Sequence, residues 1–297
     1  MSAPITCLIG FGEVGQTLAA NLRAGGLTAR AWDILFSDPR SIQSRAIPSS
    51  GVVAASSAGD AITGAELVIS AVTADDCLAA AHTAASLLKQ GAFFLDLNSV
   101  SPTTKIEAAR AIAAGRGRYV EAAVMSPIRP KGIQSPILLG GPDAAAFLPL
   151  ARAVGFSAIE VASDTIGRAS ATKMCRSVMI KGVEALLTES LLAARRYGVD
   201  GAVLASLNGM LPAADWSALA HYMIGRSLQH GRRRAAEMRE VAATVRNAGI
   251  EPWMSVATAE RQNWAVNHAG ALPEETLEGL LDAILASIGA VDGTSLC

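Results

Sequence analysis

The stretch Ile5–Gly15, which reads ITCLIGFGEVG, joins a short apolar run to three closely spaced glycines. The apolar run predicts a buried strand, and the composition of the following Gln16–Leu22 segment predicts a helix. Between a strand and a helix, a GxGxxG sequence indicates a loop that holds the pyrophosphate of a dinucleotide. Gly10 permits the tight turn, Gly12 lets the backbone approach the phosphates, and Gly15 lets helix and strand pack closely. The stretch therefore predicts a dinucleotide-binding unit.

An acidic residue ends the second predicted strand, Ala29–Asp33. The Asp33 carboxylate can accept hydrogen bonds from the adenosine ribose hydroxyls and would repel a 2′-phosphate, which favours NAD over NADP. Arg40 and Arg45 follow in the next loop and can instead reach such a phosphate, so NADP stays open. A glycine-rich turn without a ligand is the structural alternative. The predicted cofactor residues of this region are Gly10, Phe11, Gly12, Glu13, Val14 and Asp33.

Charge and hydropathy limit the classes of partner. The 297 residues include 25 Lys+Arg and 26 Asp+Glu. With no concentrated positive surface, we expect no nucleic-acid partner. Hydrophobic residues make up 51% and mean hydropathy is +0.34, yet the most apolar stretches, 67–72 and 283–291, fall short of a membrane span of about 18 residues. We therefore expect no membrane association.

The four cysteines, Cys7, Cys77, Cys175 and Cys297, lie far apart and form no CxxC pair. No histidine accompanies them at a metal-ligand spacing. This pattern predicts neither a disulfide framework nor a metal site. It is typical of a protein from a reducing, cytoplasmic compartment.

Short β-branched runs alternate with alanine-rich helical segments through the first half of the chain. This is the pattern of a parallel sheet covered by helices, so the predicted class is α/β with a doubly wound parallel sheet of the Rossmann type. The predicted strands are Ile5–Ile9, Ala29–Asp33, Leu67–Val72, Ala92–Leu97, Tyr119–Met125, Ile137–Leu139 and Ala158–Val161. The predicted helices between them are Val14–Ala24, Asp75–Lys89, Pro102–Ala114 and Asp143–Val154.

Strand signals almost vanish after Ser163, and helical periodicity continues to the C-terminus. We predict a dinucleotide-binding domain over residues 1–163 and an all-α substrate and dimerisation domain over residues 164–297. The apolar surface of the helical half favours a homodimer. Its predicted helices are Ile166–Tyr197, Asp200–Leu211, Asp215–Leu228, Arg232–Ala248, Met254–Asn267 and Glu274–Ile288.

Polar residues form a stripe on the first of these helices. Ser170, Lys173, Ser177 and Lys181 are spaced i, i+3, i+7 and i+11, which places them on one helix face. A lysine that is partly removed from water beside another cation has its charged form disfavoured, which moves its pKa toward the range useful for proton transfer. Lys173 is therefore a candidate acid/base. The alternative is an ordinary amphipathic helix whose lysines reach solvent.

Four segments together resemble one known family. The glycine fingerprint, DLNSVSP at 96–102, EAAVMSP at 121–127 and the helix at 167–177 occur in the order seen in β-hydroxyacid dehydrogenases. That family includes 3-hydroxyisobutyrate dehydrogenase and the 6-phosphogluconate dehydrogenases. The resemblance covers nearly the whole chain and implies a dehydrogenase that uses a nicotinamide cofactor.

The resemblance also implies roles for individual residues. Lys173 occupies the position of the family's catalytic lysine. Asn98 and Ser99 match the pair beside the nicotinamide ribose, and Val72 and Thr73 match the strand end that touches the cofactor. Met125 and Ser126 stand near the residues that bind the substrate carboxylate.

The chain departs from the family pattern at several positions. Arg176 and Ser177 replace the usual two asparagines, so Ser177 stands where the family has its substrate-contacting asparagine. We count Ser177 with the catalytic candidates, and Arg176 and Lys181 with the substrate-binding ones. The segment at 121–127 lacks the usual Ser-Gly-Gly, and no late Lys-Asp pair is evident near Ala236-Glu237. The chain is similar in these respects to a divergent bacterial subgroup of mostly unassigned activity.

The sequence thus predicts an NAD(P)-dependent dehydrogenase for a small β-hydroxyacid or its keto or semialdehyde form, with Lys173 as general acid/base. Two alternatives stay open. An imine or ketone reductase on the same scaffold would not need the missing carboxylate anchors. A non-catalytic sensor would bind the dinucleotide without turnover.

Overall fold

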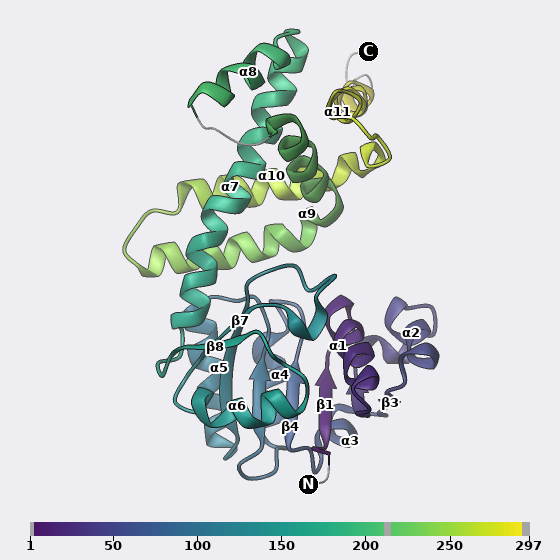
Figure 1. Cartoon of the computed structure of the whole chain (residues 1–297), viewed down its shortest axis with the longest axis vertical. Coiled ribbons are helices and arrows are strands. Elements are labelled where there is room, and N and C mark those ends of the chain that lie inside the picture. Colours follow the sequence, from purple (N-terminus) through teal and green to yellow (C-terminus); the bar gives the residue numbers. More distant parts are fainter. Residues whose placement is uncertain (1–2, 211–214, 293–297) are drawn as a thin grey trace. The chain divides into compact units, whose positions relative to one another are not determined.

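The chain divides into two compact units, Met1–Met174 and Cys175–Cys297. The computed structural model describes residues 3–210 and 215–292. The first unit is built around an eight-stranded sheet with the order β3-β2-β1-β4-β5-β6-β7-β8 (Figure 1). Its strands are β1 (Thr6–Ile9), β2 (Ala29–Trp32), β3 (Val53–Ala54), β4 (Leu67–Ser70), β5 (Phe93–Asp96), β6 (Arg118–Val124), β7 (Ile137–Gly140) and β8 (Ile159–Ser163).

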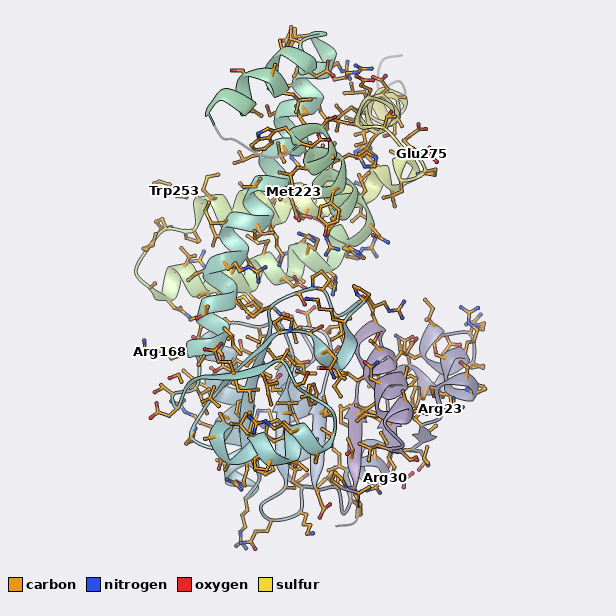
Figure 2. All side chains as sticks on the ribbon, viewed as in Figure 1. Arg23, Arg30, Arg168, Met223, Trp253 and Glu275 are labelled. Atoms are coloured by element: carbon orange, nitrogen blue, oxygen red, sulfur yellow. The ribbon has the colours of Figure 1, made fainter. Side chains whose placement is uncertain are left out.

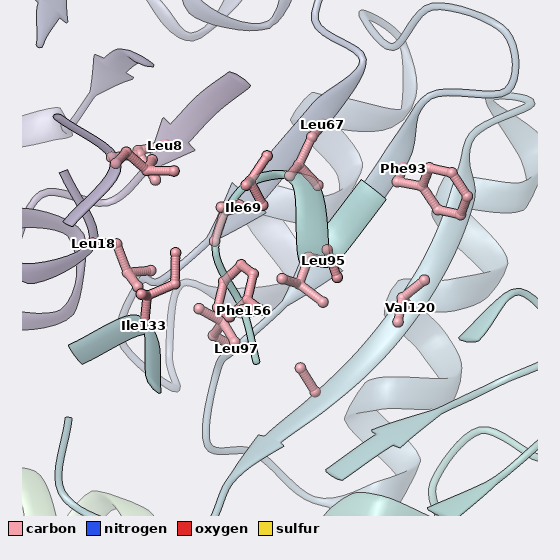
Figure 3. Close-up of a cluster of buried hydrophobic side chains, with 14 of the residues drawn as sticks. Leu8, Leu18, Leu67, Ile69, Phe93, Leu95, Leu97, Val120, Ile133 and Phe156 are labelled. Carbon is pink, nitrogen blue, oxygen red and sulfur yellow. The ribbon is translucent and has the colours of Figure 1, made fainter. Parts of the chain in front are cut away.

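Helices cover both faces of this sheet. One core contains Leu8 of β1 with residues of α1 and α6 (Figure 3), and the other contains Cys7 and Ile9 with residues of α3, α4 and α5. Because successive strand residues point to opposite faces and both faces are buried, the inner strands are mostly apolar, and polar residues among them, such as Ser70, Asp96 and Glu121, are buried too. The predicted doubly wound sheet is confirmed. The helices are α1 (Glu13–Ala24), α2 (Ile42–Ser50), α3 (Ala58–Ile62), α4 (Cys77–Ala85), α5 (Pro102–Ala114) and α6 (Ala144–Ala153), with 3-10 turns η1 (Ile34–Ser37) and η2 (Gly132–Gln134).

The sheet is not wholly parallel, and it has more elements than predicted. Strand β7 runs antiparallel to β6, whereas the other neighbouring strands are parallel. The elements β3, α2 and α3 were not predicted. Both residues of β3 are exposed, and α2 contains Pro48 and has no buried residue, so neither carries an apolar pattern. Arg23 of α1 (labelled in Figure 2) donates from Nη1 to the carbonyl oxygen of Ser49 at 3.0 Å. This hydrogen bond connects α2 to α1.

The second unit is helical within its described residues, as predicted. Helix α7 (Arg168–Arg196) begins in the first unit and continues into the second. No helix in the described part of the chain is long and apolar enough to span a membrane. The further elements are α8 (Asp200–Met210), α9 (Trp216–Asn247), α10 (Trp253–Ala265), the 3-10 turn η3 (Val266–Ala271) and α11 (Leu277–Asp292).

Helix α9 corrects one prediction. The expected helices Asp215–Leu228 and Arg232–Ala248 form a single helix, so the break expected between them is wrong. A Cβ atom added at Gly231 would lie 2.2 Å from the carbonyl oxygen of Gln262 on α10. The glycine therefore lets two helices approach closely and does not end one of them.

Candidate functional site

The candidate site lies where neighbouring parallel strands end. The glycine loop follows β1 and Asp33 follows β2, while Val72, Asn98 and Met125 follow β4, β5 and β6. In the sheet these strands are neighbours in the order β2-β1-β4-β5-β6. Their carboxyl ends therefore share one edge. Helix α1, which follows β1, and helix α4, which follows the neighbouring β4, pack on opposite faces of the sheet. Open α/β sheets bind ligands in the crevice at such a switch point.

Each glycine of the loop has its own steric environment. Gly10 has φ +92°, and a Cβ there would lie 2.4 Å from the carbonyl oxygen of Ala71. A Cβ at Gly15 would lie 2.2 Å from the carbonyl oxygen of Gly10. By contrast, a Cβ at Gly12 would meet no atom within 4 Å, and Gly12 gives α1 no side-chain cap. The loop thus leaves open space at the amino end of α1, where backbone N–H groups and the helix dipole suit a diphosphate.

Asp33 lies against the glycine loop. Its Oδ2 accepts the N–H of Phe11 at 2.6 Å, and its Oδ1 accepts the N–H of Leu35 at 2.9 Å. Each oxygen keeps a lone pair that can accept a ribose hydroxyl. The carbonyl of Phe11 accepts Gln16 Nε2 at 2.8 Å, so both backbone polar groups of Phe11 already have partners in the chain. Arg40, the alternative partner of a 2′-phosphate, forms an ion pair with Asp38 at 3.4 Å.

The buried Asn98 joins the ends of two strands. Its Oδ1 accepts the N–H of Val72 at 2.7 Å, and its Nδ2 donates to Oγ of Ser70 at 3.0 Å. Val72 in turn lies beside the glycine loop, with Cγ1 3.0 Å from the position of a Cβ on Gly10. Thr73 Oγ1 donates to Asp76 at 2.6 Å, just before α4. The amide of Asn98 therefore fixes the β4 and β5 ends against the glycine loop.

Lys173 reaches this edge from α7. Its Nζ donates to Oγ of Ser99 at 2.6 Å, and both side chains are half-buried. The first turn of α7 is held by Glu121 of β6, whose Oε2 accepts the N–H of Gly167 and whose Oε1 accepts the N–H of Ser170, both at 2.6 Å. Glu121 is fully buried. The structure thus brings Lys173 and Ser99 together within the first unit.

Sequence reasoning missed a buried ion pair at the end of β5. Lys105 Nζ lies 3.0 Å from Asp96 Oδ1, and the side chains are 1% and 0% exposed. Tyr119 also donates its hydroxyl to Asp96 at 2.6 Å, and burial together with the Asp96 charge raises the pKa of this phenol well above its usual value. Burial raises the pKa of the neighbouring Cys77 thiol to about 12. The available signal was an aspartate closing the apolar run FFLD, with a lysine in the next helix.

The remaining predicted substrate residues have partners of their own. Lys181 Nζ pairs with Glu237 Oε2 at 2.5 Å. The backbone N–H of Met125 donates to the carbonyl of Pro136 at 2.8 Å, and Ser126 Oγ donates to the carbonyl of Pro127 at 3.1 Å. Along α7, Arg176 is exposed and Ser177 half-buried, and both belong to the second unit.

Arg234 belongs to a run of three arginines, Arg232–Arg234, on α9. Such a run usually forms a solvated helix face, but Arg234 is 4% exposed and pairs with the buried Glu184. Gln262 Nε2 also donates to Glu184 at 3.3 Å. Burial raises the pKa of Glu184, and the neighbouring Arg234 opposes this shift. Among residues 3–210 and 215–292, no three His, Cys, Asp or Glu side chains gather in a way that could hold a metal ion.

Two family models match the chain. The model described as the NAD binding domain of 6-phosphogluconate dehydrogenase matches residues 6–146, which include the glycine loop and the strands that carry Asp33, Val72 and Asn98. The model described as a domain of unknown function (DUF1932) matches residues 194–265 of the helical unit.

Solved structures resemble nearly the whole chain. A conserved hypothetical protein from Sinorhizobium meliloti 1021 is 35% identical, with 96% of this chain and 97% of that chain covered and a TM-score of 0.73. A conserved protein of unknown function, whose structure is described as similar to 3-hydroxyacid dehydrogenases, is 33% identical over 95% of this chain and 98% of that chain, with a TM-score of 0.68. Mycobacterium tuberculosis 3-hydroxyisobutyrate dehydrogenase, solved with L-serine, is 15% identical over 95% of this chain and 99% of that chain, with a TM-score of 0.72, which shows the shared fold.

Proposed function

Because the chain belongs to the β-hydroxyacid dehydrogenase family, we propose that it is an NAD(P)-dependent oxidoreductase for a small β-hydroxyacid or its keto or semialdehyde form. The first unit would bind the dinucleotide, and the second would contribute substrate contacts. The observation that carries this proposal is the 2.6 Å hydrogen bond between Lys173 and Ser99, at the sheet edge that holds the glycine loop.

Lys173 would act as general acid and base. In the oxidative direction the neutral amine takes the proton from the substrate hydroxyl while the carbon gives up its hydride. In the reductive direction the protonated amine donates that proton to the carbonyl oxygen. A bound nicotinamide supplies or accepts the hydride. Ser99 keeps the amine oriented toward the sheet edge.

The cofactor residues divide by the part of the dinucleotide that they would meet. The backbone at Gly12, Glu13 and Val14 suits the pyrophosphate, Gly10 permits the tight turn that places it, and Asp33 suits an unmodified adenosine ribose. We therefore favour NAD and keep NADP as the alternative. Near the nicotinamide, the proposed residues are Val72, Thr73, Asn98 and Ser99, with Phe11 supporting the loop.

The substrate residues are proposed on position alone. Met125 and Ser126 follow β6 at the same edge, and Arg176, Ser177 and Lys181 continue along α7 from Lys173. The exposed, cationic Arg176 would favour a carboxylate, whereas the charge of Lys181 is paired with Glu237. We also propose a homodimer, because the helical unit leaves large apolar side chains such as Tyr197 and Trp253 exposed by 84% and 76%. Light scattering would measure this assembly.

The test is a screen that follows the absorbance of reduced cofactor. NAD and NADP are offered with β-hydroxyacids of graded side-chain size, and ketones and cyclic imines are offered with the reduced cofactors. We expect turnover with a hydroxyacid. Turnover of imines or ketones alone would favour the reductase alternative, and cofactor binding without turnover of any class would favour the sensor.

A matched pair of lysine variants tests the proposed acid/base. Lys173→Met should lower kcat by about 10²- to 10⁴-fold, the usual contribution of a positioned acid/base, and leave the Kd of the cofactor unchanged. Lys89→Met, at an exposed lysine before β5, should behave as wild type. Full activity of the Lys173→Met variant would refute the assignment.

A further inference from the structure

Two buried carboxylates lie side by side beneath the candidate site. Asp96 and Glu121 are register partners in the parallel strands β5 and β6, and both side chains are 0% exposed. Paired residues of neighbouring strands point to the same face of a sheet. Tyr119, two residues before Glu121 on β6, indeed donates its hydroxyl to Asp96 at 2.6 Å. The sheet therefore sets the separation of the two carboxylates.

Asp96 controls the turn that carries Ser99. Its Oδ1 accepts the N–H of Asn98 at 2.9 Å, and Lys105 Nζ binds both this oxygen at 3.0 Å and the Asp96 carbonyl at 2.8 Å. Ser99 is the next residue after Asn98. The backbone that leads into Ser99 is therefore fixed at Asp96 and at Asn98 by buried, charge-assisted hydrogen bonds.

Glu121 controls the helix that carries Lys173. Its two oxygens accept the N–H groups of Gly167 and Ser170 at the start of α7, where the helix dipole favours negative charge. Lys173 follows Ser170 by three residues and so lies on the same face of the helix. A Cβ at Gly140 would lie 2.5 Å from Glu121 Oε2, so the glycine makes room for this carboxylate.

We propose that Asp96 and Glu121 are positioning residues that together set the distance between Ser99 and Lys173. One carboxylate fixes the turn of the hydrogen-bond acceptor, the other fixes the helix of the donor, and the β5–β6 pairing holds the two in register. A buried charge is costly unless several donors compensate it, and both carboxylates have such donors. This inference rests on the proposed function for its effect on catalysis, and on the Lys173–Ser99 contact for its geometry.

The catalytic test is a double-mutant cycle. Glu121→Gln keeps the side-chain shape but removes the charge and one acceptor oxygen. We expect kcat to fall by about 10- to 100-fold, as for a misplaced catalytic group, with the Kd of NADH or NADPH unchanged. Combined with Ser99→Ala, the loss should be little larger than that of the more impaired single variant, because both changes break one arrangement. Independent, multiplying losses would contradict the proposal.

A second readout needs no substrate. Reductive methylation with ¹³C labels the lysine amines, and NMR then reports the surroundings of each one; Lys89 and Lys131 are exposed references. We expect Ser99→Ala and Glu121→Gln to move the Lys173 signal, identified by its absence in Lys173→Arg, in the same direction. An unmoved signal in folded Glu121→Gln would overturn the positioning role. This readout does not depend on turnover. A failure of the positioning proposal can therefore be distinguished from a failure of the proposed enzyme activity.

The Asp96 arm needs a variant that does not strand a buried charge. Asp96→Asn combined with Lys105→Met removes both charges of the pair while nearly conserving volume, and it should also move the Lys173 signal. Ser57→Ala is the control, since it removes the cap of α3, an Oγ that accepts the Asp60 N–H at 3.1 Å, away from both carboxylates. It should lower Tm without moving that signal. If the shift of the Lys173 signal merely scaled with the loss of Tm in every variant, Ser57→Ala included, the proposal would be refuted.

Discussion

Lys173 Nζ donates a hydrogen bond to Ser99 Oγ at 2.6 Å, although the two residues are 74 positions apart in the sequence. Ser99 follows Asn98, whose Oδ1 accepts the N–H of Val72, and Val72 lies against Gly10. A short series of contacts therefore links the proposed acid/base to the glycine loop. All of these residues belong to the first compact unit, so their arrangement is a property of one folded body.

Ser99→Ala tests the acceptor of this hydrogen bond. Without the hydroxyl, the amine loses a partner that holds it, and we expect kcat to fall by about tenfold while the KM for the cofactor changes little. Ser99→Thr keeps a hydroxyl and should retain most of the activity. Steady-state kinetics on the substrate found by the screen provides the measurement. Equal activity of the alanine and threonine variants would show that the hydroxyl is unimportant.

Two glycines of one loop should respond oppositely to the same substitution. At Gly12 a Cβ has open space, so Gly12→Ala should fold with a nearly normal Tm but bind the dinucleotide weakly. At Gly15 a Cβ would collide with the Gly10 carbonyl oxygen, so Gly15→Ala should lower Tm strongly. Thermal unfolding and fluorescence titration with NADH and NADPH measure the two effects. Unimpaired cofactor binding by Gly12→Ala would contradict the proposed pyrophosphate site.

Asp33→Asn tests the choice of cofactor. The amide keeps one acceptor oxygen, so it can accept only one of the N–H groups of Phe11 and Leu35, and it loses the charge that would repel a 2′-phosphate. We expect the ratio of the NADPH Kd to the NADH Kd to fall by about tenfold, the effect of one partly screened charge pair. Binding titrations at low and high salt measure this ratio. An unchanged ratio at low salt would mean that Asp33 does not face the phosphate position.

The pair of Arg195 and Asp282 gives the second unit an acid-sensitive contact. Arg195 donates from Nε and Nη2 to Asp282 at 2.8 and 2.7 Å, joining α7 to α11, and these hydrogen bonds lower the pKa of Asp282 below its ordinary value of 3.8. A carboxylate with a lowered folded-state pKa stabilises the fold above its unfolded-state pKa, and this contribution is lost as the pH falls.

The corresponding variant is Asp282→Asn. Its unfolding free energy should lie below that of wild type at pH 7, and the difference should shrink below about pH 4 and in high salt. Chemical denaturation at both pH values measures this. Because Asp282 is 58% exposed, the difference should be small. A difference that grows on acidification would contradict the assignment.

The sequence predicted the fold best where burial is two-sided. The strands β1, β4 and β5 are apolar except for one residue at an end of each, and their pattern identified them. Strand direction leaves no such mark, so the antiparallel β7 was not foreseen. The short β3 and the helix α2 bury no side chain and carry no periodic signal. Helix α9 was divided wrongly because Gly231 looks the same in a sequence whether it ends a helix or admits a neighbour.

The sequence indicated the loop and helix residues of the candidate site but not the buried charged residues that hold them in place. The glycine loop, Asp33, Asn98 and Lys173 stand at recognisable positions after strands or on a polar helix stripe, although their roles stay predictions. The buried Asp96, Lys105 and Glu121 were missed, because charged residues are mostly exposed and are seldom fully buried unless they are paired. The burial of Arg234 was likewise not evident from the sequence, because the neighbouring arginines suggest an exposed helix face.

Helices α9 and α10 approach closely at Gly231 because glycine has no Cβ atom. Even alanine there must push the two helix backbones apart, so natural variation at this position should be restricted by packing alone. Enzyme engineers who stabilise helices by replacing glycine with alanine would therefore gain at many such positions and lose at this one.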